Sequence, residues 1–209
     1  MATETVMLVH GLWMNGMDML LLRWRLRQAG YRVRRFSYRS LANTPRENAR
    51  ALQAQIASLD DPVMHFVCHS LGGLVIRHLF DEFPHQRPGR IVTLGTPHRP
   101  SHAAQQLYRF TPGRVLLGNS ISDGLLGSVP DWSGSHDLGS IAGDLQLGMG
   151  LFIPGIPKPN DGAVAVAETK LEGMRDHAVI HASHFGLLLS REAENHIESF
   201  LVTGSFRKD

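Results

Sequence analysis

The chain has 209 residues, of which 43% are hydrophobic and 19% are charged, a composition typical of one globular domain with a sizeable core. Its formal net charge of +2 is too small to indicate a nucleic-acid-binding protein. Its one cysteine, Cys68, excludes an intrachain disulfide. The chain begins without the pattern of a signal peptide, and no apolar run reaches the roughly 18 residues of a membrane span. We therefore expect a cytoplasmic protein without stable membrane insertion, and the sequence leaves open whether a signal peptide was removed.

Apolar runs and helical periodicity alternate along the chain. The predicted order is strand 5–9, helix 17–28, strand 31–38, helix 45–59, strand 63–68, helix 71–83, strand 91–94, helix 102–110, strand 138–142, strand 176–182 and helix 185–202. A capping box formed by Thr44 and Glu47 marks the start of the second helix. Because strands alternate with helices, we predict an α/β fold with a doubly wound, mostly parallel sheet in a single domain over residues 1–209.

Residues 101–159 weaken this alternation, because glycine and proline break up the short apolar runs there. Apart from the short helix and strand already mentioned, we expect a loop-rich cap or insertion within the domain. This Gly-rich stretch would be a minimal lid.

Arginines are concentrated near the first predicted helix and the strand after it, at positions 23, 25, 27, 32, 34, 35 and 39. The apolar residues of the same two elements are expected to face the core. We therefore interpret the arginines as a solvated face, with attraction of an anionic lipid or an acidic substrate as the alternative.

The most informative stretch surrounds Ser70. An apolar strand over residues 63–68 is followed by His69-Ser70-Leu71-Gly72-Gly73, and then by a run at helical periodicity. This strand–turn–helix context is the one that a nucleophile elbow requires, and it directs the first N–H groups of the helix at whatever Ser70 attacks. The alternative is that Ser70 only caps the helix. We interpret Ser70 as a catalytic nucleophile.

Four predicted strands end in polar or glycine-containing signatures, and in a parallel sheet these ends meet at one edge. The signatures are His10-Gly11, Cys68-His69-Ser70, Gly95-Thr96-Pro97-His98 and Ser183-His184. A serine hydroxyl needs a base within hydrogen-bond reach, and the base needs a third group that orients it. This convergence predicts an active site at the carboxyl edge of the sheet.

We expect His184, at the end of the last strand, to be the base, with His98 as the alternative. Asp161 precedes His184 in a Gly- and Pro-rich loop and is the candidate acid. Asp161 could instead only hydrogen-bond its own turn, and Asp144 is a competing acid. The order serine, aspartate, histidine along the chain is the one expected for this fold.

A developing oxyanion needs donors that are in place before the reaction. The N–H of Leu71, at the start of the elbow helix, is one candidate. The loop after the first strand supplies the second candidate, the N–H of Leu12, because Gly11 lets the backbone turn toward Ser70.

Taken together, these motifs resemble the α/β-hydrolase superfamily, and within it a bacterial lipase/esterase branch that is also similar to GPI-inositol-deacylase-like enzymes. The matching residues are His10-Gly11-Leu12, Cys68-His69-Ser70-Leu71-Gly72-Gly73-Leu74 with Arg77, Gly95-Thr96-Pro97-His98, Asn160-Asp161-Gly162-Ala163-Val164 and His184. The resemblance implies that Asp161 is the triad acid and that Arg77 is structural.

The chain departs from this pattern at three places. Cys68 stands where the elbow usually has glycine. Phe185-Gly186-Leu187 follows His184 where some of these lipases have acidic calcium ligands, so no metal and no cofactor is expected. No long amphipathic lid is apparent, which favours small, soluble esters over interfacial activation.

The sequence therefore predicts a serine ester hydrolase that cleaves short or medium acyl esters through an acyl-enzyme. A true lipase or lipid deacylase, a thioesterase or acyltransferase, and a catalytically silent binding protein of the same fold are the alternatives. The expected partner is a small-molecule or lipid ester and not a nucleic acid, and the sequence does not indicate the oligomeric state.

Overall fold

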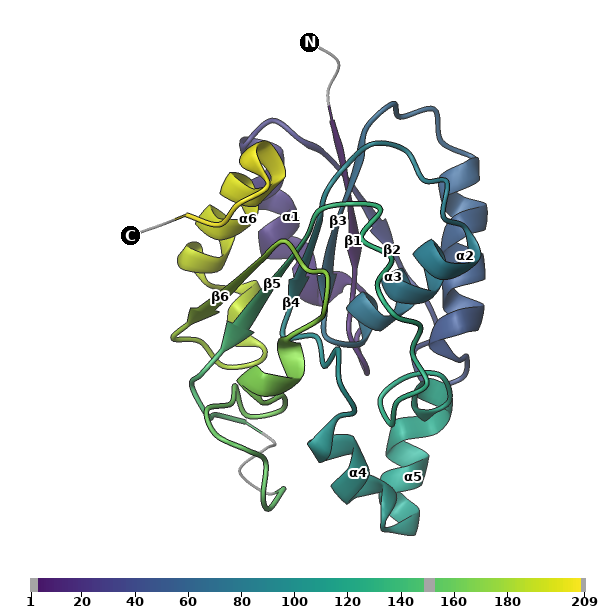
Figure 1. Ribbon diagram of the computed structural model, residues 1–209, viewed down its shortest axis with the longest axis vertical. Helices are drawn as coiled ribbons and strands as arrows, with labels where there is room; N and C mark the ends of the chain where they lie inside the picture. The colour runs from purple at the N-terminus through teal and green to yellow at the C-terminus, as the bar shows by residue number, and fades with distance from the viewer. Residues whose placement is uncertain (1–3, 149–152, 208–209) are drawn as a thin grey trace.

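The computed structural model describes residues 4–148 and 153–207. Its centre is a parallel sheet in the order β2-β1-β3-β4-β5-β6 (Figure 1). The strands are β1 (Thr5–Val9), β2 (Arg32–Phe36), β3 (Met64–His69), β4 (Ile91–Leu94), β5 (Leu138–Gly143) and β6 (Asp176–Ile180). Residues of β1, β3, β4 and β5 are buried throughout, because helices cover both faces of the sheet. The predicted doubly wound α/β sheet is confirmed.

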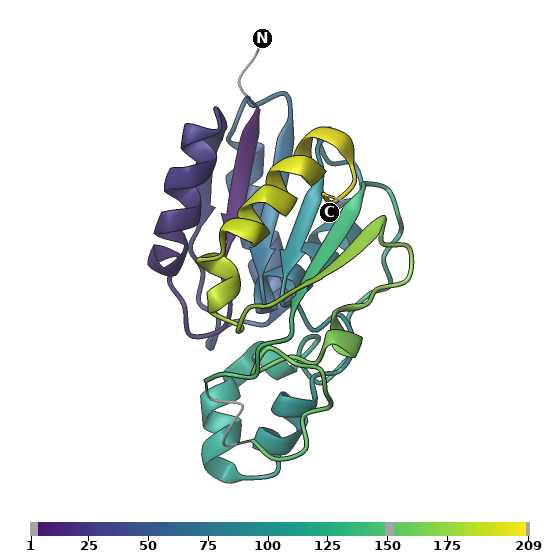
Figure 2. The same ribbon diagram turned by 90° about the vertical axis from the view of Figure 1, so that its left-hand side faces the viewer.

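Helices cover the sheet in two layers. Those of the described residues are α1 (Leu20–Gln28), α2 (Pro45–Ala57), α3 (Leu71–Glu82), α4 (His102–Tyr108), α5 (Thr111–Leu117) and α6 (Arg191–Thr203). One core cluster packs α1 and α6 on one face, and a second packs α2 and α3 on the other. Figure 2 shows α1 and α6 in front of the sheet. None of the described helices has both the length and the apolar character needed to cross a membrane.

The local signals explain where some helices begin. The Thr44 hydroxyl accepts from the Glu47 N–H at 3.1 Å, and the Glu47 carboxylate accepts from the Thr44 N–H at 2.8 Å. This is the predicted capping box. The predicted helix over 185–202 is instead divided into a 3₁₀ turn (Gly186–Leu188) and α6, because the Ser190 hydroxyl caps a new helix by accepting from Ala193 N–H at 3.2 Å.

Residues 101–159 contain more regular structure than expected. Helix α5 was not predicted, because Gly113 and Gly118 suggested a loop. A Cβ at Gly113 would lie 2.0 Å from the carbonyl oxygen of Leu107, so this glycine permits α4 and α5 to pack closely. Strand β5 lies in the same stretch but belongs to the sheet.

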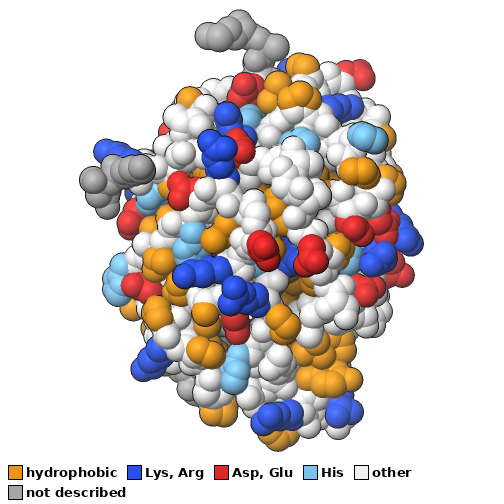
Figure 3. Space-filling view, in the orientation of Figure 1, with side chains coloured by type: hydrophobic (Ala, Val, Ile, Leu, Met, Phe, Trp, Pro, Cys, Tyr) orange, Lys and Arg blue, Asp and Glu red, His pale blue; other side chains and the backbone are white. Residues whose placement is uncertain are grey.

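Helices α4 and α5 lie beyond the carboxyl ends of the strands (Figures 1 and 2). The outer side of α5 exposes Val115 and Leu116, and Figure 3 shows apolar side chains gathered there, at the lower right. The inner side contributes Leu117 to a third cluster with Leu71 and Leu74 of α3. Helices α4 and α5 therefore cover the residues that follow β3, and we call this pair of helices the roof.

Candidate active site

Ser70 lies at the sharp turn between β3 and α3, with φ 52° and ψ −121°. A residue other than glycine is strained in this region, by about 1–3 kcal/mol, and such strain is frequent at functional sites. The Ser70 side chain makes no capping hydrogen bond to α3. The hydroxyl is therefore not used to cap the helix, which was the alternative interpretation of this residue.

Close packing around the turn accounts for the two glycines after it. A Cβ at Gly72 would lie 2.5 Å from the carbonyl oxygen of Val9, and a Cβ at Gly73 would lie 2.4 Å from the hydroxyl of Thr96. That hydroxyl donates to the Ser70 carbonyl at 2.8 Å. Cys68, the unusual first residue of the elbow, is fully buried, and burial raises the pKa of its thiol well above the usual range.

His184 and Asp161 are directly paired. The Nδ1–H of His184 donates to Oδ2 of Asp161 at 2.7 Å, and Asp161 is fully buried. The other carboxylate oxygen, Oδ1, accepts from the N–H groups of Ala163 at 2.9 Å and Val164 at 2.7 Å. Each carboxylate oxygen therefore has its own partners: Oδ1 holds the turn, and Oδ2 contacts the His184 imidazole.

Gly95, which follows β4, makes room for this pair. Its φ of 57° is in the left-handed region, and a Cβ there would lie 2.9 Å from Nδ1 of His184 and 3.0 Å from Oδ2 of Asp161. The strand-end signature Gly95-Thr96-Pro97-His98 therefore contributes space to the site instead of a reacting group.

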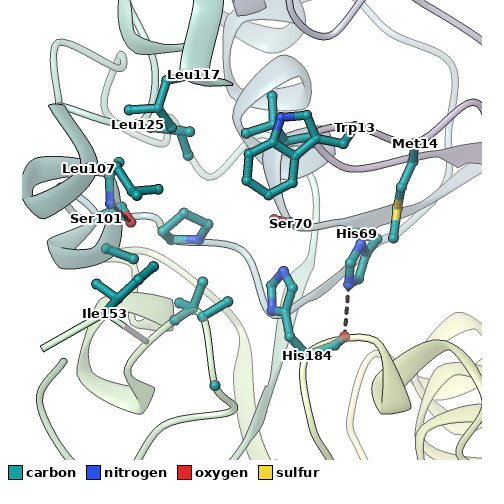
Figure 4. Close-up of a pocket in the computed structure, with 17 residues that line it drawn as sticks. Trp13, Met14, His69, Ser70, Ser101, Leu107, Leu117, Leu125, Ile153 and His184 are labelled. Atoms are coloured by element: carbon teal, nitrogen blue, oxygen red, sulfur yellow. Dashed lines mark hydrogen bonds between the residues drawn. The ribbon is translucent and has the colours of Figure 1, made fainter. Parts of the chain in front are cut away.

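His69 supports the main chain of His184. Its Nε2–H donates to the carbonyl oxygen of His184 at 3.0 Å, and the two imidazole rings lie 4.7 Å apart (Figure 4). Burial, together with the neighbouring His184, lowers the pKa of His69 to about 3. His69 is thus neutral at physiological pH, and its N–H is committed to positioning. Sequence analysis had not assigned it this contact.

The loop after β1 is held by a second network. The Nδ1–H of His10 donates to the Gly11 carbonyl at 2.8 Å, its Nε2 accepts from the Tyr38 N–H at 3.2 Å, and the Tyr38 hydroxyl donates to the His10 carbonyl at 2.7 Å. A trans peptide directs its C=O and N–H to opposite sides, so the N–H of Leu12 points away from His10. A Cβ at Gly11 would lie 3.0 Å from the Ser70 Cβ, which shows how closely this loop approaches the elbow.

A mostly apolar cavity of about 230 Å³ connects these groups. Ser70, His69 and His184 line one side, and Leu107, Leu117 and Leu125 lie across from them (Figure 4). Within the described residues, no hydrogen bond joins Ser70 to the His184 imidazole, and such bonds often tighten only when substrate binds.

Trp13 lines the cavity and also contacts helix α5 of the roof. Trp13 follows Leu12 with φ 61°, in the left-handed region that is uncommon for residues other than glycine. Its backbone N–H donates to the Ser40 hydroxyl at 3.2 Å, and its indole N–H donates to the Leu116 carbonyl of α5 at 2.8 Å.

The two alternative residues lie elsewhere. His98 is buried, hydrogen-bonded to the Thr93 hydroxyl at 3.1 Å, and lines a different cavity with Arg77 and Trp132. Asp144 pairs with the exposed His181 at 2.9 Å and does not line the Ser70 cavity. Arg77 is buried and donates to the carbonyl oxygens of His98 and Pro130, as expected of a structural residue.

Acidification is expected to destabilise the folded chain. Burial lowers the pKa of both His69 and His98 from 6.5 to about 3. Between these values the unfolded chain binds more protons than the folded chain, so the free energy of unfolding falls as the pH drops below about 6.5. Urea unfolding at several pH values measures this. His98→Gln should flatten the profile and the exposed His85→Gln should not, whereas a constant unfolding midpoint from pH 7 to pH 5 would contradict the prediction.

Among the described residues, no group of three or more His, Cys, Asp or Glu side chains is arranged to hold a metal ion. The site itself presents a serine on a strained turn and a histidine hydrogen-bonded to a buried carboxylate.

Comparisons with known proteins relate this geometry to a family. A family model described as "Domain of unknown function (DUF7379)" matches residues 2–108. The chain belongs to this family. None of the curated proteins that were compared matches the sequence.

Several solved structures are similar to the whole chain. The mature lipase BlEst2 of Bacillus licheniformis has a TM-score of 0.70 and 18% identity, with 98% of this chain and 93% of that chain covered. The enol-lactonase of Burkholderia xenovorans LB400 has a TM-score of 0.65 and 14% identity, with 96% and 92% covered. The carboxylesterase CesB (YbfK) of Bacillus subtilis has a TM-score of 0.59 and 14% identity, with 98% of this chain and 85% of that chain covered.

At these identities the similarity concerns the fold. A parallel sheet with helices on both faces, together with these neighbours, shows that this member of the family has the compact α/β-hydrolase fold. The fold that the resemblance implied is confirmed. The comparisons do not single out the branch that is similar to GPI-inositol-deacylase-like enzymes.

Proposed function

We propose that this protein is a serine ester hydrolase that cleaves short or medium acyl esters through an acyl-enzyme. The observation that carries the proposal is that His184, paired with the buried Asp161 at 2.7 Å, lines the same cavity as Ser70 on its strained turn. A nucleophile, a base and an orienting acid are the parts that such chemistry requires.

In the proposed reaction, the Ser70 hydroxyl oxygen attacks the ester carbonyl carbon while Nε2 of His184 takes the hydroxyl proton. Asp161 accepts from Nδ1–H of His184, which keeps Nε2 free to act as the base and stabilises the imidazolium. The carbonyl oxygen becomes an oxyanion, which the N–H groups of Leu12 and Leu71 stabilise.

The tetrahedral intermediate then collapses. The bond to the alcohol oxygen breaks, and the alcohol leaves with the proton held on Nε2 of His184. Water next attacks the acyl-Ser70 ester after giving a proton to His184. That proton returns to the Ser70 oxygen as the carboxylic acid is released, and the enzyme is restored.

The acyl group would occupy the apolar side of the cavity, under α4 and α5. Leucines at positions 107, 117 and 125 line this side. A cavity of about 230 Å³ with apolar walls favours an apolar acyl chain of limited length. In this proposal the whole chain is one catalytic domain, and residues 101–159 supply its cap.

An activity screen tests the proposal. The protein is incubated with an active-site phosphonate, and mass spectrometry locates the adduct, which we expect on Ser70. Hydrolysis of p-nitrophenyl esters of graded chain length then measures the reaction directly. No turnover of any ester together with no adduct would refute the proposed function.

We expect kcat/KM in that series to be highest for short or medium acyl chains, without a rate jump on emulsions. Leu117→Ala, which enlarges the cavity, should shift the optimum toward longer chains. Leu116→Ala changes the adjacent, exposed position of α5 and should leave the optimum unchanged. Sharp activation on emulsified long-chain triacylglycerol would contradict this prediction.

A further inference from the structure

Helix α1 and the 3₁₀ turn that leads into it (Met17–Met19) expose a row of large apolar side chains to solvent. Met17, Leu20, Leu21 and Trp24 are between 37% and 55% exposed. Leu20 and Leu21 are each three or four residues from Trp24, so these three share one side of α1, while Leu22 and Leu26 face the core. Figure 2 shows α1 at the outer edge of the layer that covers the sheet. A contiguous exposed apolar row of this kind marks an interaction site more often than isolated apolar residues do.

A row of arginines lies beside it. Arg23 and Arg27 are one helical turn apart on α1, and Arg35 is on the edge strand β2. Within the described residues, none of the three forms a salt bridge. Burial and the charges of Arg27 and Arg35 lower the pKa of Arg23, which shows that like charges are held together here.

The other arginines of this region have different surroundings. Arg25 turns inward and pairs with Glu194 at 3.3 Å. Arg32 and Arg34 both pair with the buried Asp61, at 2.6 Å and 3.1 Å. Charged residues on an edge strand protect it from pairing with another sheet, which accounts for Arg32 and Arg34. That explanation does not apply to Arg23 and Arg27, which are on a helix.

Arginines of both elements surround a hollow of about 460 Å³ between α1 and β2. Five arginines line it, together with Val33, Ser37 and Gln55, and no acidic side chain lines it. The five arginines and the Asp61 carboxylate that pairs with two of them give this region a net charge of +4, whereas the net charge of the whole chain is +2. The small net charge of the sequence therefore conceals one strongly basic region.

We propose that these side chains form a docking surface for anionic phospholipid. The docking surface comprises the apolar row Met17, Leu20, Leu21 and Trp24 and the basic row Arg23, Arg27 and Arg35. The apolar row would enter the boundary between headgroups and acyl chains, and the arginines would bind the lipid phosphates.

Two features favour a lipid surface over a free phosphate compound. A soluble phosphate needs the arginines but gains nothing from four exposed apolar side chains along the neighbouring row. The surface is also continuous in sequence with the cavity, because Met14, which lines the cavity, precedes Met17 by a short loop. Docking through α1 therefore brings the cavity near the lipid, and it does not depend on which reaction occurs there.

Vesicle co-sedimentation of the full chain tests this proposal. We expect binding to vesicles that contain phosphatidylglycerol, weakening as salt is added, and at least tenfold weaker binding to pure phosphatidylcholine. The triple variant Arg23→Gln/Arg27→Gln/Arg35→Gln should bind the anionic vesicles about 100-fold more weakly, since each arginine near the surface contributes about fivefold. Lys158→Gln/Lys170→Gln/Arg207→Gln removes three exposed cations elsewhere and should bind normally.

Tryptophan fluorescence and a second set of variants test the contribution of the apolar row. A vesicle-induced blue shift of tryptophan emission should be present in the wild type and absent in Trp24→Phe, and Leu20→Ser/Trp24→Ser should weaken binding about tenfold. Equal binding to both lipids would overturn the proposal, as would equal loss in the two triple variants. Full displacement from vesicles by millimolar inorganic phosphate at constant ionic strength would also overturn it and would indicate a phosphate site instead. Circular dichroism verifies that every variant is folded.

Discussion

Replacing Ser70 with alanine is expected to reduce ester hydrolysis by about 10⁴–10⁶-fold while the protein stays folded. The hydroxyl makes no capping bond to α3, so its removal deprives the helix of no partner. The strained backbone at φ 52° is retained, because alanine relieves the strain no more than serine does. Steady-state hydrolysis of the best p-nitrophenyl ester and thermal unfolding of both proteins measure the two effects.

Ser101 offers a matched control for this variant. It lines the same cavity, but its hydroxyl accepts from the Ala104 N–H at 3.2 Å and caps α4. Ser101→Ala should therefore cost about 1 kcal/mol of stability and leave the phosphonate adduct in place. An adduct that persists in Ser70→Ala, or one that maps to Ser101 in the wild type, would be incompatible with Ser70 as the nucleophile.

Asp161→Asn is expected to lower kcat by about 10⁴-fold, by analogy with the same change in a serine protease. The reason is that the two carboxylate oxygens of Asp161 have different hydrogen-bond partners. The amide oxygen of asparagine can still accept from Ala163 and Val164, so the turn is kept. The amide NH₂ then faces Nδ1 of His184, which must become the acceptor. The ring proton moves to Nε2, where it blocks removal of the Ser70 proton.

Stability should fall by only about 1–2 kcal/mol in this variant, because bonds to a charged acceptor become bonds to a neutral one. Asp144→Asn is the matched control: it alters an Asp–His pair of similar length, 2.9 Å to His181, outside the cavity. It should leave kcat nearly unchanged. If Asp144→Asn abolishes activity while Asp161→Asn does not, the acid has been assigned to the wrong loop.

The sequence was sufficient for the features that depend on local patterns. Apolar runs located the strands, and the arrangement of strand, turn and helix around Ser70 indicated the elbow without any knowledge of the sheet. The position of Asp161 before His184 made it a candidate acid, but the family resemblance was needed to favour that role, because an Asn-Asp-Gly sequence is equally typical of a turn.

Features that depend on contacts between distant segments were not predictable in this way. The glycine at position 113 suggested a loop, and only its packing against Leu107 shows why a helix is compatible with it. The contact of His69 with the His184 carbonyl joins residues that are 115 positions apart. The exposure of Trp24 and its neighbours was likewise unexpected, because an apolar residue on a helix is normally assigned to the core.

The hydrogen bond from the Trp13 indole to the Leu116 carbonyl ties the roof of the cavity to the loop that carries Leu12. A bulky acyl group that pushes α5 outward must either break this bond or displace the loop. Displacement would move a proposed oxyanion donor away from the reacting carbonyl. Poorly fitting substrates would then be turned over slowly even when they are bound, so the fit of the acyl chain would affect kcat as well as binding.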